Sequence, residues 1–204
     1  MLNNMQGDCS LKDLDISHNS ALKHIDDYVF GDAINQLEKV SLKFTSLTVF
    51  QLMNLFELMQ VQTILKEMNL VGNLSLAKIP QNLFARTVTK LTKITIYATK
   101  LTSTQIHSLL SHIVNKPSAL KCLDLGGNNL SSISPTLMAQ SVNKLETVIL
   151  YLAKLSVEQQ DTILKEALKE TKWKYLDLGG NQFGISEELV KEANKIIICF
   201  KLNP

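Results

Sequence analysis

Arginine is almost absent from this chain. The sequence holds 21 basic residues, yet Arg86 is the only arginine among them. Sites that grip phosphate depend on the forked guanidinium group of arginine and on a surplus of positive charge. The net charge here is only +2. We therefore expect no nucleic acid among the partners of this protein.

Cysteine and long apolar runs are also scarce. The three cysteines, Cys9, Cys122 and Cys199, are odd in number and lie far apart, which excludes a disulfide framework and a CxxC metal motif. No apolar run approaches the ~18 residues that a membrane span requires, so we expect no membrane span. Residues 1–10 lack the basic and apolar regions of a secretory signal. We expect a cytoplasmic protein, with an extracellular fragment as the alternative.

Residues for catalysis or metal binding do not occur in a useful pattern. His107 and His112 are five residues apart on one expected helix, so they do not share a face as a ligand pair would. Cys122 should lie beside Asp124, but no histidine falls on the neighbouring strands to activate the thiol. The LDLGGN stretch contains paired glycines without forming a phosphate loop. We expect no enzyme, no metal site and no cofactor.

A repeated stretch dominates what the sequence does contain. LKCLDLGGNNL at 120–130 recurs as WKYLDLGGNQF at 173–183, and weaker copies begin earlier in the chain. The LxxLxL units open at Leu11, Leu37, Leu65, Leu91, Leu120, Leu145 and Trp173, and Ile197 opens an eighth. Taken two at a time, the steps are 54 (11 to 65), 55 (65 to 120) and 53 (120 to 173) residues. The true unit is therefore a pair of unlike repeats.

The two kinds of repeat differ at their ninth position. Odd repeats have asparagine there, and even repeats have threonine or alanine: Asn19, Asn73, Asn128 and Asn181 alternate with Thr45, Thr99 and Ala153. Each even repeat continues into a capping box that starts a helix: Thr48 with Gln51, Thr102 with Gln105, and Ser156 with Gln159. The odd repeats leave room for shorter helices. Asparagine or threonine can bond the backbone of the turn that leaves the strand, so we expect the turn at Ala153 to be held least well.

The fold follows from this periodicity. LxxLxL places leucines on alternate positions of a short strand, so that they point inward. A helix returns the chain, which makes successive strands parallel. We predict an α/β solenoid in the form of a horseshoe, with a concave parallel sheet of seven to eight strands and helices on the convex face. Residues 1–10 are expected to be a partial repeat or N-terminal remnant, and residues 11–204 the repeat domain, with seven repeats plus a final strand.

The pattern resembles the leucine-rich repeat family. The motif LxxLxLxxNxL is carried most fully by Leu120, Leu123, Leu125, Asn128 and Leu130. Two alternating repeat types with full helical returns resemble the ribonuclease-inhibitor-like subfamily, although ribonuclease inhibitors commonly have cysteine at the positions of Thr45, Thr99 and Ala153. The resemblance implies a non-enzymatic protein-binding module, with immune recognition, regulation and inhibition among its settings. The cysteine difference argues against ribonuclease inhibition itself.

The concave face offers a candidate site for a protein partner. Positions three, five, seven and eight of each repeat should face solvent there. The residues that we select are Phe44, Tyr97, Asp124, Tyr151, Leu152, Tyr175 and Asp177. Tyr97 and Tyr151 should flank an open slot at Gly126, with carboxylates nearby, which favours a basic or mixed peptide surface. The alternative is that Tyr97, Tyr151 and Ile149 only pack over the sheet and cover one another.

Neither end of the repeat array has the features of a cap. Solenoids need a cover over their last apolar layer. We expect a monomer, or weak association through uncapped ends. The alternative function is a structural or spacer segment of a longer repeat array, which associates through its ends. A binding module should stay monomeric with its groove free, whereas a spacer should associate.

Overall fold

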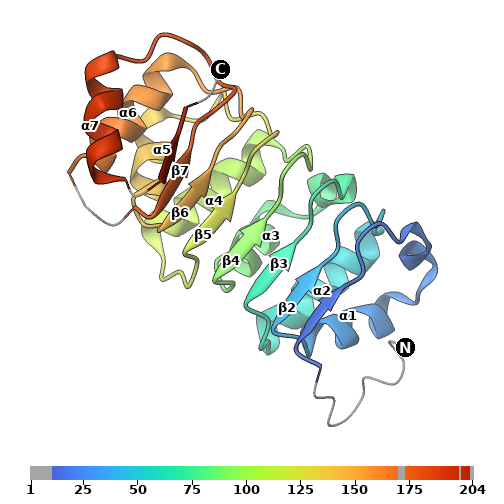
Figure 1. The fold of residues 1–204 in the computed structure, drawn as a ribbon. Coiled ribbons are helices and arrows are strands. Elements are labelled where there is room, and N and C mark those ends of the chain that lie inside the picture. Colours follow the sequence, from blue (N-terminus) through green and yellow to red (C-terminus); the bar gives the residue numbers. More distant parts are fainter. Residues whose placement is uncertain (1–10, 170–172, 198, 203–204) are drawn as a thin grey trace.

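A single parallel sheet runs the length of the molecule. The computed structural model describes residues 11–169, 173–197 and 199–202, and its eight strands follow one another in chain order (Figure 1). The strands are β1 (Asp13–Asp15), β2 (Lys39–Ser41), β3 (Glu67–Asn69), β4 (Lys93–Thr95), β5 (Cys122–Asp124), β6 (Thr147–Ile149), β7 (Tyr175–Asp177) and β8 (Cys199–Lys201). The predicted remnant at residues 1–10 lies outside the described residues.

Helices occupy one side of the sheet, as Figure 1 shows. They are α1 (Asp27–Asn35), α2 (Val49–Val61), α3 (Gln81–Val88), α4 (Ser103–Asn115), α5 (Pro135–Val142), α6 (Val157–Ala167) and α7 (Glu187–Ile196). The prediction of shorter helices in odd repeats is confirmed, since α3 and α5 have 8 residues each while α2 and α4 have 13. Two short 3-10 helices, η2 (Ser20–His24) and η3 (Leu74–Lys78), were not predicted. The predicted α/β solenoid is confirmed.

The strand register matches the spacing of the repeats. Residue three of each repeat pairs with residue three of the next, as in Lys93 with Cys122 and Cys122 with Thr147. The intervening residues point inward, and Leu123 and Leu125 are each 1% exposed. One continuous apolar core therefore lies between the sheet and the helices. No helix within the described residues is long and apolar enough to cross a membrane.

A buried glutamine joins each even repeat to the odd repeat before it. In the capping box of α4, the Gln105 side-chain carbonyl accepts a bond from the Thr102 amide at 3.0 Å. The Gln105 amide group then donates to the carbonyls of Leu76 at 2.9 Å and Ile79 at 2.8 Å. Gln51 and Gln159 repeat this arrangement. The predicted capping boxes are confirmed, and their glutamines also act as clamps between repeats.

An asparagine joins the third, fifth and seventh repeats each to the even repeat before it, and it is buried at Asn73 and Asn128. Asn128 donates to the carbonyl of Leu125 in its own turn at 3.0 Å and to that of Ile96 in the preceding repeat at 2.9 Å. Its side-chain oxygen accepts bonds from the Leu101 amide and the Thr99 hydroxyl. Asn73 and Asn181 lie in equivalent contacts. Glutamine and asparagine clamps thus alternate along the array.

The turn after β6 is held by fewer bonds than its equivalents. In the turn after β2, the Thr45 hydroxyl donates to the carbonyl of Leu42 at 2.7 Å and to Asn73 at 3.1 Å. Ala153, at the same position after β6, has no hydroxyl to make these bonds. Asn181 still donates to the carbonyl of Leu150 at 2.8 Å. The turn after β6 is therefore held by asparagine alone, whereas the turns after β2 and β4 are each held by a threonine and an asparagine.

Candidate functional site

The candidate residues lie on and beside the face of the sheet that carries no helix, which we call the concave face. Tyr175 and Asp177 begin and end β7, and Asp124 ends β5. Tyr151 and Leu152 lie in the turn after β6. The remaining two, Tyr97 and Phe44, lie in the turns after β4 and β2. Six of the seven therefore lie on the adjacent repeats of β4 to β7, and Phe44 is two strands removed from them.

Every one of these turns requires a left-handed backbone at the eighth position of the repeat. The residues there have positive φ: His18, Phe44, Gly72, Ala98, Gly127, Leu152 and Gly180. Glycine adopts this conformation without strain, whereas other residues incur about 1 kcal/mol or more. Phe44 and Leu152 are strained in this way, and they are also 51% and 44% exposed. Neither side chain belongs to the buried core, although the Phe44 ring stacks on that of His18 with 5.2 Å between the ring centroids.

The glycines of odd repeats make room for rings from the preceding even repeat. A methyl group on Gly126 would lie 2.8 Å from Cδ2 of the Tyr97 ring, and one on Gly127 would lie 3.1 Å from its Cζ. Gly126 is buried under this ring. The prediction of an open slot at Gly126 was therefore wrong, because Tyr97 folds over it. Tyr151 remains 38% exposed, so the alternative of mutual covering describes Tyr97 better than Tyr151.

Two other glycines receive side chains in the same way. A methyl group on Gly72 would lie 2.3 Å from Cδ1 of Phe44. One on Gly180 would lie 2.6 Å from Cδ2 of Leu152 and 3.3 Å from Cε2 of Tyr151. The sequence revealed the glycines and the rings separately. Their contact depends on the left-handed turn, which aims the side chain at the next repeat.

The two aspartates of the site are fixed by the backbone. Oδ1 of Asp124 accepts a bond from the Gly126 amide and Oδ1 of Asp177 one from the Gly179 amide, both at 2.9 Å. Burial raises the pKa of Asp124, and the nearby charge of Asp177 raises it further, while the bond from Gly126 opposes the shift. Within the described part of the chain, neither carboxylate has an ion-pair partner.

Tyr175 contacts both Asp177 on its own strand and Lys201 on the last strand. Its hydroxyl donates to Oδ2 of Asp177 at 3.3 Å, and the Lys201 ammonium lies 5.5 Å from the centre of its ring. Asp177 is buried, at 9% exposure. The outer oxygen of Asp124 is the more accessible of the two carboxylate positions, since Asp124 is only half-buried.

The first half of the concave face carries charges that neutralise one another. The Lys39 ammonium lies 3.4 Å from the Glu67 carboxylate, and that of Lys93 lies 3.9 Å from it. These groups line a hollow of about 340 Å³ over β1 to β4. In the second half, Asp124 and Asp177 form no ion pair with a described residue, although the charge of Lys201 acts on Asp177 from the last strand. Among the residues that the structure describes, an incoming positive group would find carboxylates without an ion pair at both ends of the face, at Asp13 and Asp15 on β1 and at Asp124 and Asp177 beyond β4; only the second pair lies beside the exposed ring of Tyr151.

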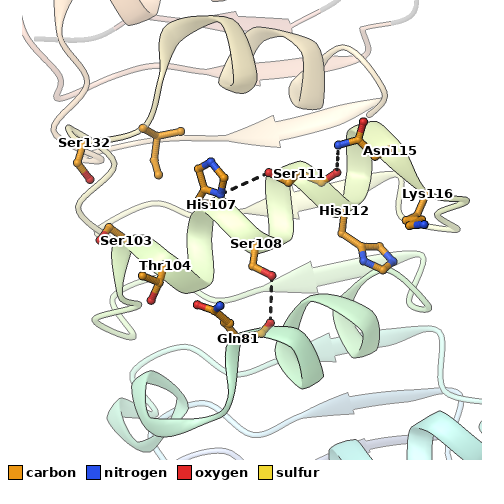
Figure 2. Close-up of a pocket in the computed structure, with 11 residues that line it drawn as sticks. Gln81, Ser103, Thr104, His107, Ser108, Ser111, His112, Asn115, Lys116 and Ser132 are labelled. Carbon is orange, nitrogen blue, oxygen red and sulfur yellow. Dashed lines mark hydrogen bonds between the residues drawn. The ribbon is translucent and has the colours of Figure 1, made fainter.

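A larger groove, of about 690 Å³, lies on the helical side and follows α4 (Figure 2). Figure 2 shows serine, threonine and histidine side chains along it, with the Ser111 hydroxyl 3.4 Å from Nδ1 of His107. Burial lowers the pKa of His112, with Lys116 and Arg86 adding to the effect. The lining residues include no carboxylate that could orient His107 as a base. Within the described ranges, no group of three His, Cys, Asp or Glu side chains could hold a metal ion.

Comparison with known proteins agrees with this architecture. Residues 119–140 match the family model described as Leucine Rich Repeat. No curated protein matches the sequence. The structure is similar to that of an LRR protein of Leptospira interrogans, with a TM-score of 0.58 and 20% identity over 99% of this chain and 44% of that chain. It also matches the tropomodulin C-terminal domain of Caenorhabditis elegans, with a TM-score of 0.37 and 14% identity over 81% and 86% of the two chains.

The family model and the Leptospira structure, together with the strand order, establish the fold as a leucine-rich-repeat solenoid. The chain spans less than half the length of the Leptospira protein. Domains of this kind are generally scaffolds for protein interaction and are typically non-catalytic.

Proposed function

We propose that this leucine-rich-repeat solenoid is a non-enzymatic protein–protein interaction module that binds a protein partner on its concave face. The observation that carries the proposal is the pair of exposed apolar side chains at Phe44 and Leu152. Glycine at these turn positions would be free of strain, as it is at Gly72 and Gly180. Large apolar groups there cost backbone energy and leave apolar surface exposed, even though Phe44 stacks on the His18 ring at 5.2 Å between ring centroids and Leu152 lies against Gly180; contact of the exposed part with another molecule would offset this cost.

The neighbouring residues support a contact surface in the second half of the sheet. Tyr151 presents a rigid ring that is 38% exposed, and tyrosine is enriched at protein interfaces. Asp124, Tyr175 and Asp177 supply polar groups at fixed positions beside it. A basic or mixed protein surface fits this combination of rings and carboxylates.

The alternation of two repeat types supports a place in the ribonuclease-inhibitor-like subfamily for the domain at residues 11–204. Immune recognition and regulation are settings that this subfamily suggests, and we propose the cytoplasm as the compartment. Nucleic acid is a poor candidate partner because Arg86 is the single arginine of the chain.

The spacer function is the second candidate, and the ends of the array favour it. Leu14 on β1 and Phe200 on β8 are only half-buried, whereas equivalent residues inside the array, such as Leu123, are 1% exposed. Partly exposed core positions at both ends could be covered by association. Light scattering across a range of concentrations separates the two functions, because a spacer gains mass with concentration while a module with a free groove stays monomeric.

The test of the module is capture of a partner from cells of the source organism with wild type and a Tyr151→Lys/Leu152→Ala variant. The sixth repeat then carries the side chains that other even repeats already have, as at Lys43 and Ala98. This precedent predicts a folded variant. A protein retained by wild type and by the helical-face control Arg86→Ala, but lost from the variant, supports the proposal. Equal retention by all three proteins would refute the concave site.

A further inference from the structure

Three apolar platforms repeat along the turns that follow the strands. Phe44 lies against Gly72, the Tyr97 ring lies across Gly126 and Gly127, and Leu152 with Tyr151 lies against Gly180. Each platform therefore starts in an even repeat and leans onto the next odd repeat. We call this set the rim row: Phe44, Tyr97, Tyr151 and Leu152. The rings are seated on backbone, so the row is rigid.

The spacing of the rim row is set by the sheet. Platforms recur every second strand, because the side chains that lean onto the glycines of the next repeat come only from even repeats. Neighbouring strands are about 4.8 Å apart, so the platforms recur at about 9.6 Å. A partner that contacts all three must present apolar groups on one side at nearly this interval.

This interval discriminates between the forms that a peptide can take. A β-strand presents side chains on one face at about 6.6 or 13.2 Å, and neither value fits. In an α-helix, residues seven apart lie on one face about 10.5 Å from each other, so their positions fall out of step with the platforms by nearly 2 Å over two intervals. A polyproline II helix has three residues per turn and a rise of about 3.1 Å, hence about 9.3 Å per turn. Only the last stays in step across the whole rim row.

The polar groups of the site suit the same form. The backbone carbonyls of a polyproline II segment have no internal bonds and need donors from the partner. Within the described residues, the hydroxyls of Tyr97 and Tyr151 donate to no protein acceptor, in contrast to that of Tyr175. Asp124 lies on the strand between their two repeats and has no ion pair among the described side chains. It can receive a basic side chain of the bound segment.

We propose that the rim row binds a basic, proline-rich segment of a partner protein in the polyproline II conformation, with an apolar residue on each of the three platforms. This inference rests on the proposed function, whose partner it specifies. The tyrosine rings contact the apolar residues at every third position, their hydroxyls bond the segment's carbonyls, and Asp124 pairs with a lysine or arginine between the first and last contacts.

The test uses fluorescein-labelled peptides of twelve residues and their binding by fluorescence anisotropy. The probe is four repeats of Leu-Pro-Arg. A shuffled peptide of the same composition breaks the three-residue period, and a peptide with glutamate for arginine reverses the charge. A helical peptide with leucine every seventh residue, and alanine for proline, tests the competing form. Each is titrated into wild type, Tyr151→Phe, Leu152→Gly and the helical-face control Arg86→Ala.

We expect the Leu-Pro-Arg peptide to bind about tenfold more tightly than the shuffled and glutamate peptides. Tyr151→Phe removes only a hydroxyl and should weaken binding about threefold to tenfold, while Leu152→Gly should weaken it about tenfold. Arg86→Ala should match wild type. Far-UV circular dichroism of each variant confirms that the fold is retained.

The unfavourable outcomes separate the two proposals. Tighter binding of the helical peptide, lost in Leu152→Gly, would overturn the polyproline II form and leave the concave site in place. Binding of the Leu-Pro-Arg peptide that neither rim variant weakens would overturn both the rim row and the concave site. Absence of binding by the Leu-Pro-Arg peptide up to millimolar concentration would overturn the polyproline II inference alone, since partner capture tests the concave site independently.

Discussion

At the scale of the residue, the most specific feature of this chain is that a large side chain in the turn of an even repeat lies over a glycine in the turn of the next odd repeat. A ring on one repeat and a glycine on the next form a pair that neither residue explains alone. Phe44 and Gly72 are the tightest example, since a methyl group on the glycine would lie 2.3 Å from the ring. The pair can therefore be tested by substituting each member separately and together.

Gly72→Ala should lower the free energy of unfolding by roughly 2 kcal/mol, from left-handed strain and overlap with the ring. In a Phe44→Ala background the same change should cost only about 1 kcal/mol, because strain remains and the overlap is gone. Urea denaturation of the four proteins in this cycle measures the difference. Equal costs in both backgrounds would show that Phe44 does not occupy the space above Gly72.

Asp124→Asn should raise stability at neutral pH and weaken binding of basic peptides. Asparagine keeps the oxygen that accepts the Gly126 amide, as Asn69 does for Val71 at 3.2 Å in the third repeat. The pKa of Asp124 is raised in the folded state, first by burial, so the folded protein holds its proton more tightly than the unfolded chain does. The stability contributed by protonation is present at low pH and is lost as pH rises through the raised pKa.

The thermal midpoints of wild type and Asp124→Asn, measured from pH 3 to pH 8, check this expectation. The variant should be more stable near pH 7, and the gap should close towards pH 3, where the wild-type carboxyl is already protonated. A gap that is constant over the whole range would mean that charge at Asp124 has no part in the difference.

The sequence was sufficient to place most of the site residues on the right repeats, because strand side chains alternate and the register follows the spacing. It was not sufficient to show that Tyr97 closes over Gly126. That contact depends on the backbone angles of the turn, which set the direction of the ring, and the alternation of side chains along a strand does not predict these angles. The seating of Asp124 on the Gly126 amide was missed for the same reason.

At the scale of the element, side-chain amides hold each repeat to the one before it. The capping box predicted two bonds around each glutamine, both local to its helix. The further bonds of Gln105 reach residues 26 and 29 positions earlier. Sequence rules for helix starts do not reach that far, although the buried carbonyls of such a loop must find donors somewhere.

Gln105→Ala should lower the free energy of unfolding by roughly 2 to 4 kcal/mol, because the Ile79 carbonyl and the Thr102 amide lose their side-chain partner and the Leu76 carbonyl keeps only the bond from the Ile79 amide. Gln105→Glu should cost at least as much at pH 7, since its carboxylate would face two carbonyl oxygens. Lowering the pH should recover part of the Glu variant's loss, because the protonated acid can donate one bond.

Urea denaturation at pH 7 and pH 4 measures these effects, with His107→Ala on the exposed side of the same helix as the control. A loss below about 0.5 kcal/mol for Gln105→Ala would place it among ordinary surface substitutions and contradict the clamp.

Ala153→Thr should stabilise the protein by about 1 kcal/mol, because its hydroxyl can make the bonds that Thr45 makes in the turn after β2. Ala153→Val adds the same volume without the hydroxyl and serves as the matched control. Thermal unfolding should show a higher midpoint for threonine than for valine. A lower midpoint for both variants would mean that the turn after β6 has no room for a branched side chain.

At the scale of the whole molecule, each repeat touches mainly its neighbours, so stability should be greatest where both neighbours are present. Exposed ion pairs add a second regular feature, as where Lys121 and Lys174 flank Glu146 at 3.2 and 2.5 Å. Both cations lower the pKa of Glu146, and the hydrogen bond from Lys174 has the larger effect. Such pairs on the surface contribute little to stability. The core and the clamps are therefore the main source of cohesion.

Native-state hydrogen exchange should follow this expectation. Amides that bond across the inner strands, such as Ile96 to Asp124 and Leu125 to Ile149, should exchange most slowly. Those at the ends, such as Ile16 to Ser41 and Leu178 to Lys201, should exchange at least tenfold faster. Mass spectrometry of peptides from each repeat gives the profile. Uniform protection from β1 to β8 would show instead that the array opens only as one unit.

The alternation of clamps has a consequence for how such a chain can change in length. Asparagine reaches back to an even repeat, and glutamine reaches back to an odd one. Duplication of residues 65–119, an odd repeat followed by an even one, would leave every clamp with its proper neighbour. Duplication of residues 91–119 alone would place two even repeats side by side. The turn of the first would then lack the asparagine that an odd repeat supplies, and the glutamine of the second would lack the carbonyls that it binds in an odd repeat. The array can therefore lengthen without loss of these bonds only by whole pairs of repeats, one odd and one even.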